Sequence, residues 1–352
     1  MAIPEPLATL LQTPGPSGHE ARAATVWRDW CASFAQEVDV DSSGSSWARV
    51  PGTAGGPCLA VVGHIDEIGV HVTHIDDEGF LRFGALGGWD PVNIVGQRVV
   101  LATRDGAVHG VVGRKPSHLL DEEDRKRPIE FKGLQIDIGA VDGEQARSLV
   151  RIGDSGVIDA APLELLGGRV VSRSLDNRVG CHVAARAGQL VAQAGGASGD
   201  YLALAVVGEE LGYFGAQTSA YRHRPDVAIV VDVAHATDIP GFELGESSEH
   251  RLGSGPVIDR GPMLHPRVFE LLHATAETEA IPFTLHSNPD ASGTDADALH
   301  ISRDGIPTGL VEVPLRYMHS AVEMIDPRDL EHAARLVAAF AMALSAETSF
   351  ER

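Results

Sequence analysis

The chain contains 352 residues, of which 43% are hydrophobic and 22% are charged, and its formal net charge is -21. This length allows one large α/β domain that carries an insertion, or two domains. No segment holds the ~20 uninterrupted apolar residues of a membrane-spanning helix, and the negative charge opposes binding to nucleic acid or to an anionic membrane. We therefore expect neither nucleic acid nor a membrane as a partner.

The sequence also predicts a cytoplasmic location. Its first residues lack the basic region and the long apolar stretch of a secretory signal. The three cysteines, Cys31, Cys58 and Cys181, are odd in number and widely separated, which does not suggest a disulfide framework.

The first half of the chain divides into a helical start and a β-rich segment. Ser17 and Glu20 have the spacing of a capping box, so we expect a helix from there to about Phe34. From residue 69, short β-type runs are separated by glycines and Asp-Glu-Gly turns, which is typical of small antiparallel sheets. We interpret residues 69–163 as an inserted β-rich domain.

The remaining residues, 1–68 and 164–352, are predicted to form one α/β domain. Apolar runs such as "YLALAVVG" and "DVAIVVDV" alternate there with helical segments, and a long helix ends the chain. Near-continuous apolar strands that alternate with helices indicate a mostly parallel sheet with helices on both faces.

Five apolar runs of this domain lead to a histidine or an acid. These positions are His64 with Asp66, Asp176, Glu209 with Glu210, Asp232, and His319. The carboxyl ends of parallel strands meet at one crevice, so we expect these side chains to share a site. Each alone also has an ordinary explanation, such as a helix N-cap or a surface pair. Their common position after apolar runs favours the site.

The residue types point to metal chemistry. So many acids in one place would repel one another unless cations neutralised them. Two histidines and three carboxylates suit two divalent ions that share one bridging carboxylate and leave positions open for water. One further acid would remain beside the ions, where a general base is needed. The adjacent Glu209 and Glu210 therefore divide into one ligand and one base.

These motifs resemble those of the TET-type aminopeptidases, co-catalytic metallopeptidases also known as glutamyl aminopeptidases, deblocking aminopeptidases or endoglucanases. The matching stretches span nearly the whole chain and include "TPGPSGHE", "GHIDEIG", "SLDNRVG", "GEELGYFGA", "DVAHATDIPG", "SGTDADALH" and "RYMHSAVEM". The resemblance implies a phosphorylase/hydrolase-like α/β catalytic domain. It also implies that residues 69–163 form a β-rich dimerisation domain.

The resemblance assigns a role to each residue of the group. The implied metal ligands are His64, Asp176, Glu210, Asp232 and His319. Asp176 would bridge the two ions, and Glu209 would be the general base that activates a metal-bridging water. Asp66 would orient His64.

The segment "SGTDA" supplies the candidate substrate-binding residues Gly293, Thr294 and Asp295. The implied cofactors are two divalent ions per subunit, zinc or cobalt, with manganese as the alternative. The implied partners are short peptides, cleaved from the amino end, and further copies of the chain, as dimers that assemble into a dodecamer. Two other functions stay open: a glycosidase with paired carboxylates and no metal, and a non-catalytic scaffold of the same fold.

Overall fold

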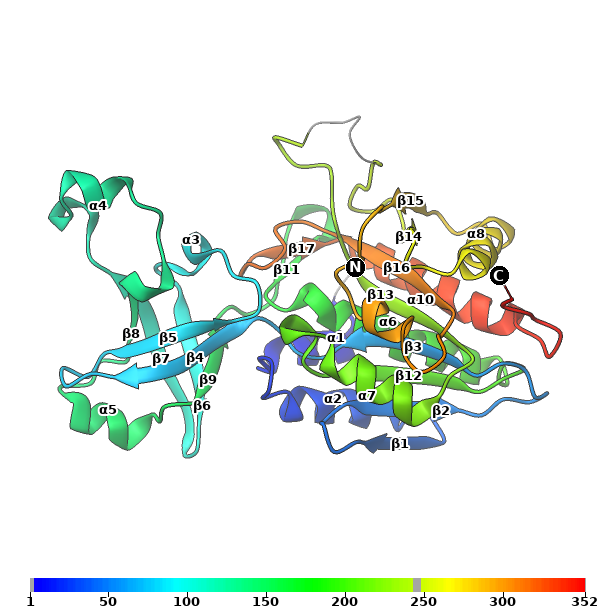
Figure 1. Cartoon of the computed structure of the whole chain (residues 1–352), viewed down its shortest axis with the longest axis horizontal. Helices are drawn as coiled ribbons and strands as arrows, with labels where there is room; N and C mark the ends of the chain where they lie inside the picture. Colours follow the sequence, from blue (N-terminus) through cyan, green and yellow to red (C-terminus); the bar gives the residue numbers. More distant parts are fainter. Residues whose placement is uncertain (1–2, 243–247, 352) are drawn as a thin grey trace.

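The computed structural model describes residues 3–242 and 248–351. They form a large α/β unit and a smaller β unit beside it (Figure 1). The predicted α/β fold with a separate β-rich sheet is therefore confirmed. None of the helices in the described part of the chain is both long and apolar enough to cross a membrane.

An eight-stranded sheet forms the centre of the large unit. Its strands, in spatial order, are β1 (Glu37–Val40), β2 (Ser46–Val50), β12 (Tyr201–Val206), β3 (Leu59–His64), β13 (Val227–His235), β16 (Thr308–Leu315), β14 (Val257–Arg260) and β15 (Thr284–Ser287). The central strands β12, β3, β13 and β16 are parallel, whereas β2 and β14 run antiparallel to their neighbours in this core. The sheet is thus mixed at its edges. At the outermost pair, the short connection from β1 to β2 permits only antiparallel pairing.

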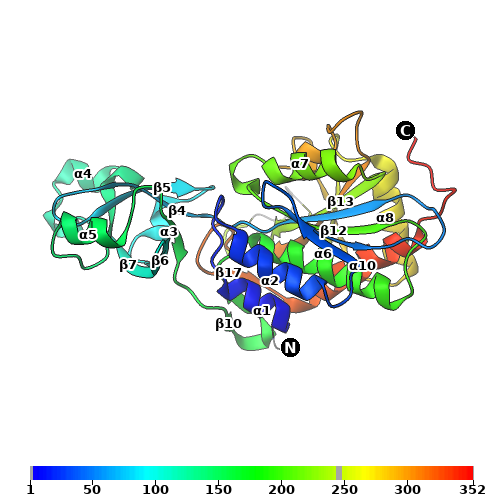
Figure 2. The same ribbon diagram turned by 90° about the horizontal axis from the view of Figure 1, so that it is seen from below.

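Helices cover both faces of the sheet, as predicted. One face carries α1 (Glu5–Gln12), α2 (Ala21–Cys31), α6 (Leu175–Gln193), α8 (Pro266–Thr278) and α10 (Pro327–Ala343), and the other carries α7 (Phe214–His223) and α9 (Ala296–Leu299). Successive side chains of a strand point to opposite faces, so Val61 of β3 packs with the first group and Val62 with the second. Figure 2 shows α7 across the sheet from α1, α2, α6 and α10.

The predicted capping box does not form. Helix α2 starts at Ala21 and ends at Cys31, so it is shorter than expected, and its N-cap residue makes no side-chain hydrogen bond to the helix. The Ser17 hydroxyl instead donates to Asp66 at 2.7 Å, and the Glu20 carboxylate accepts from the Gly18 backbone N–H at 2.7 Å. The Ser17 hydroxyl therefore binds Asp66, which is distant in sequence, and not the backbone of the helix as the local pattern predicted.

The smaller unit is a closed barrel inserted after β3. Its strands, in spatial order, are β4 (Gly69–Ile75), β5 (Leu81–Leu86), β8 (Leu134–Asp137), β7 (Gly106–Arg114), β6 (Arg98–Thr103) and β9 (Ser155–Ile158), and its helices are α3 (Pro91–Ile94), α4 (Glu122–Lys126) and α5 (Gly143–Leu149). Val70, Leu81 and Ile136 belong to its separate hydrophobic core. A third, three-stranded sheet follows the barrel and consists of β10 (Leu163–Glu164), β11 (Val170–Ser172) and β17 (Glu323–Ile325).

Candidate metal centre

Most of the predicted site residues lie at the carboxyl ends of the central strands. His64 is the last residue of β3, and Glu209 and Glu210 begin a 3-10 turn shortly after β12. Asp232 lies inside β13, which continues to His235 rather than ending at the acid. Parallel neighbours β12, β3 and β13 thus bring four side chains to one edge of the sheet.

Asp176 differs from the prediction, whereas His319 follows a strand of the main sheet as expected. Asp176 lies at the start of α6 and is preceded by β11, which belongs to the three-stranded sheet rather than the main one. His319 lies in the turn between β16 and β17. The expectation that all five runs belong to one sheet is therefore wrong. Pairing of β11 with β17 holds these two segments together.

The Asp176 carboxylate lies between the two histidines. Its Oδ1 is 3.1 Å from Nε2 of His64, and its Oδ2 is 3.3 Å from Nε2 of His319. Each oxygen therefore faces a different imidazole, so Asp176 could offer one oxygen to each of two ions.

Two overlapping groups of three ligand atoms, which share His64, each lie close enough together to hold an ion. One group contains His64, Asp176 and Glu210, and the other contains His64, Glu209 and Asp232; within each group the ligand atoms lie within 4.8 Å of one another. Nε2 of His319 is 3.7 Å from Oε1 of Glu210. These residues line a cavity of about 650 Å³. The structure thus brings all the predicted ligands to one cavity.

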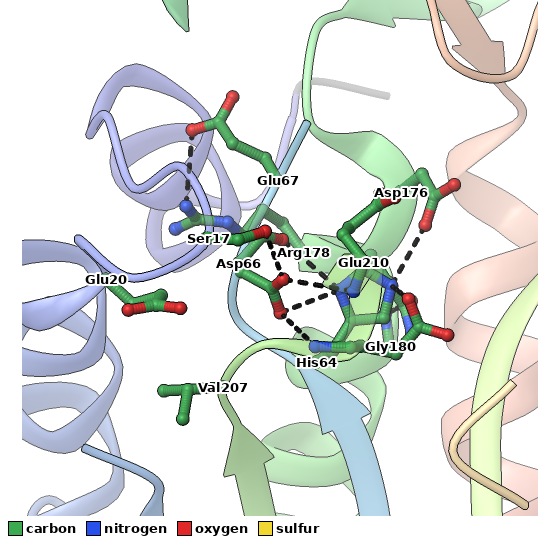
Figure 3. A network of polar contacts seen from close by, with 12 residues as sticks. Ser17, Glu20, His64, Asp66, Glu67, Asp176, Arg178, Gly180, Val207 and Glu210 are labelled. Atoms are coloured by element: carbon green, nitrogen blue, oxygen red, sulfur yellow. Dashed lines mark hydrogen bonds and ion pairs between the residues drawn. The ribbon is translucent and has the colours of Figure 1, made fainter. Parts of the chain in front are cut away.

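Hydrogen bonds fix the His64 ring. Its Nδ1 is 3.2 Å from the carbonyl oxygen of Asp66 and 3.4 Å from the Asp66 carboxylate. That carboxylate also accepts from the Ser17 hydroxyl and from the backbone N–H groups of Glu209 and Glu210, the last two at 3.2 Å. Figure 3 shows Asp66 between Ser17 and His64. A proton on Nδ1 leaves Nε2 free to bind a metal.

The His319 ring is held by the barrel unit. Its Nδ1 is 2.7 Å from the carbonyl oxygen of Gly88, in the loop that follows β5. A Cβ atom at position 88 would lie 2.9 Å from this nitrogen, so the contact requires glycine. Gly88 also lines the cavity. The insertion therefore contributes directly to the site.

Sequence reasoning missed Glu323 as well as Gly88. The buried Glu323 carboxylate accepts from the backbone N–H of Asp176 and from that of His319, both at 3.1 Å. It thus fixes the backbone of two predicted ligands. Its only sequence signal is its place in "RYMHSAVEM", a stretch that assigns it no role.

Burial and the close approach of several acidic side chains shift the pKa values of the site residues. Burial raises the pKa of Glu209 to about 10, and burial with the neighbouring Asp176 raises that of Glu210 to about 7. Burial, together with the charge of Asp176, also raises the pKa of Asp232 to about 7. The hydrogen bond with Asp176 raises the pKa of His319 to about 9. Without added cations these acids therefore tend to take up protons, as expected of a site built to bind positive charge.

Only two of the three candidate substrate-binding residues line the cavity. Gly293 and Thr294 line the cavity, but Asp295 is not among its lining residues and is only 1% exposed. Both Asp295 carboxylate oxygens are buried without a hydrogen-bond partner among the described residues. Burial raises the pKa of Asp295 to about 8. It therefore lies behind the residues that line the cavity.

Comparison with known proteins shows the family of the chain. The family model of the M42 glutamyl aminopeptidases matches residues 44–336. The chain belongs to this family. The resemblance to TET-type aminopeptidases is thereby confirmed, and the protein is a peptidase.

Individual relatives match over almost the full length. The chain is 33% identical to lysyl aminopeptidase of Pyrococcus furiosus over 95% of each chain. Its structure resembles a TET aminopeptidase of a marine sediment archaeon, Thaumarchaeota archaeon SCGC AB-539-E09, with a TM-score of 0.92 and 34% identity over 97% of this chain and 96% of the other. It also resembles the TET1 peptidase of Pyrococcus horikoshii, which can assemble into a tetrahedron or a large octahedral shell, with a TM-score of 0.85 and 32% identity over 97% and 99%.

Proposed function

We propose that the protein is a dinuclear metal-dependent aminopeptidase that removes N-terminal residues from short peptides. The observation that carries this proposal is the carboxylate of Asp176, whose two oxygens each face the Nε2 of a different histidine inside one acid-lined cavity. Imidazole and carboxylate donors suit zinc, cobalt or manganese. The proposed ligands are His64, Asp176, Glu210, Asp232 and His319.

Glu209 is the proposed general base. Two divalent ions, when bound, would polarise the peptide carbonyl and acidify water. Glu209 lies in the cavity wall with Oε2 at 3.7 Å from Nε2 of His64. It takes the proton from the attacking water and passes it to the departing amine. Asp66 keeps Glu209 and Glu210 in place through their backbone N–H groups and orients His64.

Specificity for the amino end would come from the acids of the cavity. A free α-ammonium group is attracted by carboxylates that the ions do not fully neutralise, and Glu209 and Asp232 line the cavity. Because Asp295 is buried behind the wall, it is left out of this contact. Gly293 and Thr294 would contact the substrate backbone.

We also propose that the barrel, within residues 69–163, mediates dimer formation and that dimers assemble into a dodecamer in the cytoplasm. Its surface exposes large apolar side chains, namely those of Val92, Leu119, Val141, Leu149 and Ile152. Exposed apolar side chains mark an interaction surface where they form one contiguous patch. The tetrahedral assembly of the Pyrococcus horikoshii relative supports the proposal.

Chelation tests the proposed chemistry. Exhaustive treatment with a chelator should abolish hydrolysis of aminoacyl chromogenic substrates, and added zinc, cobalt or manganese should restore it. Full turnover by protein shown to be metal-free by mass spectrometry would refute the proposal. Hydrolysis of a glycoside that survives chelation would instead favour a glycosidase with paired carboxylates, which family membership does not otherwise favour. Metal binding without turnover of any peptide would instead indicate a non-catalytic scaffold.

A further inference from the structure

A buried ion cluster adjoins the candidate metal centre. Glu67 forms ion pairs with two arginines, Arg173 and Arg178, and its Oε1 is 3.4 Å from Nη2 of Arg178. Glu67 and Arg173 are buried, and Arg178 is 0% exposed. Figure 3 shows the ion pair of Glu67 and Arg178 together with Ser17 and Asp66. None of the three charged residues lines the cavity, so the cluster is separate from the site described above.

The cluster contains more positive than negative charge. Glu67 is in contact with Arg173, and these two side chains alone would form a balanced pair. Arg178 therefore brings a second positive charge that Glu67 does not need. Burial of a charge is strongly unfavourable unless an opposite charge compensates it. The compensating acid for Arg178 must consequently lie outside the pair of Glu67 and Arg173.

Hydrogen bonds do not explain the burial of Arg178. A guanidinium carries five N–H donors, but Nε and Nη1 of Arg178 have no hydrogen-bond partner among the described residues. Its Nη2 reaches Glu67 at 3.4 Å. A Cβ atom at position 15 would lie 2.6 Å from this Nη2, so Gly15 leaves the room that the guanidinium needs. The positive charge itself is therefore the property that requires an explanation.

Two buried acids next to the cluster lack a cationic partner. Asp66 is 0% exposed and Glu20 is 7% exposed, and neither forms an ion pair with a lysine or arginine in the part of the chain that the structure describes. Burial raises the pKa of Glu20, and the charge of Arg178 acts in the opposite direction. Burial lowers the pKa of Arg178, and the charges of Glu67 and Asp66 oppose that shift. Asp66 and Glu20 thus supply the negative charge that Arg178 faces.

The cluster also joins the segments that support the proposed ligands. Oε1 of Glu67 accepts from the backbone N–H of Gly15 at 3.0 Å, and its backbone carbonyl accepts from the N–H of Ser17 at 3.2 Å. The Ser17 hydroxyl in turn donates to Asp66 at 2.7 Å. Arg178 begins the regular part of α6, two residues after the proposed bridging ligand. One buried cluster therefore connects the loop before α2, the end of β3 and the start of α6.

We propose that Arg178 is a positioning residue of the metal centre and that it acts through Asp66. Its positive charge holds the Asp66 carboxylate between Ser17 and His64, where Asp66 orients the His64 ring and binds the N–H groups of the adjacent acids Glu209 and Glu210. Arg178 does not line the cavity, so it contacts no substrate. The inference rests on the proposed metal centre, but its first readout is metal affinity and not turnover.

Zinc affinity tests the proposal. Arg178→Met removes the charge from a long side chain, whereas Arg178→Lys keeps the charge. Zinc dissociation constants of the full-length proteins are measured by competition with a chromophoric chelator. Arg178→Met should weaken zinc binding roughly 10- to 100-fold, as residues that orient metal ligands do, and Arg178→Lys should restore most of the affinity. Arg186→Met is the matched control, because Arg186 lies on the same helix and pairs with Glu331; it should keep the wild-type affinity.

The visible absorption spectrum of the cobalt-loaded proteins separates positioning from a purely structural role. Arg178→Met should change this spectrum, because a displaced His64 alters the coordination, and Arg178→Lys should not. Wild-type zinc affinity and spectrum in folded Arg178→Met would overturn the proposal. If Arg178→Met fails to fold, Arg178→Lys decides, since weakened zinc binding by this folded variant would show that the charge does not suffice. Failure of the proposed peptidase function would appear as absent turnover in the wild type and would leave these differences unchanged.

Discussion

The adjacent acids Glu209 and Glu210 should respond differently to the same substitution. Glu209→Gln removes the proposed base, and a positioned general base contributes roughly 10²- to 10⁴-fold in rate. This loss corresponds to about 3–5 kcal/mol of transition-state stabilisation. Because the proposed ligands remain in place, zinc content should stay at the wild-type level. The measurements are kcat with an aminoacyl chromogenic substrate at saturating zinc, and zinc per subunit after dialysis.

Glu210→Gln should act on the metal instead. Nε2 of His319 is 3.7 Å from Oε1 of Glu210, and Glu210 shares a ligand group with His64 and Asp176. Even residues that only orient a metal ligand account for roughly 10- to 100-fold in affinity, so loss of a ligand should cost at least as much. If both variants kept wild-type kcat and zinc content, or if Glu209→Gln lost zinc while Glu210→Gln did not, the assigned roles would be wrong.

Three further predictions follow from the geometry of the site and of the core. Gly88→Ala should weaken zinc binding by roughly 10- to 100-fold, because its Cβ would lie 2.9 Å from Nδ1 of His319; a zinc titration of wild type and variant checks this. Burial lowers the pKa of His182 to about 4 from 6.5. The unfolded chain therefore binds more protons than the folded one between these pH values, and stability should fall by about 3 kcal/mol as pH drops from 6.5 to 4. His182→Phe should abolish this part of the pH dependence in chemical denaturation, and an unchanged slope would contradict the assignment. Finally, a short peptide should be shortened stepwise from its amino end while its N-acetylated twin is cleaved roughly a hundredfold more slowly; equal internal cleavage of both, seen by mass spectrometry, would exclude an aminopeptidase.

The sequence predicted which side chains form the site better than it predicted which strands position them. His64 and the Glu209–Glu210 pair were found because a buried apolar strand that runs into a charged residue is a local pattern. Asp176 was also found, but its strand belongs to another sheet, because strand pairing depends on partners far away in sequence. The hydroxyl of Ser17 shows the same limit, since the local spacing of a capping box could not reveal Asp66 as a competing acceptor.

The residues that the sequence did not reveal share a physical property: they act on backbone groups or through them. Gly88 offers a carbonyl oxygen, which every residue possesses, and its lack of a side chain matters only because His319 packs against it. Glu323 binds the N–H groups of Asp176 and His319, so its role depends on the turn that brings these segments together.

These backbone contacts join the barrel, the small sheet and the main sheet at one point. β3 of the main sheet supplies His64, the barrel loop after β5 holds His319, and the pairing of β11 with β17 sets Asp176 opposite both rings. A shift of the barrel relative to the sheet would therefore move the His319 imidazole and leave the His64 imidazole in place. If Asp176 bridges two ions, as proposed, the affinity for the second ion would depend on the contact between the two units, and a dimer interface on the barrel would act on this same contact.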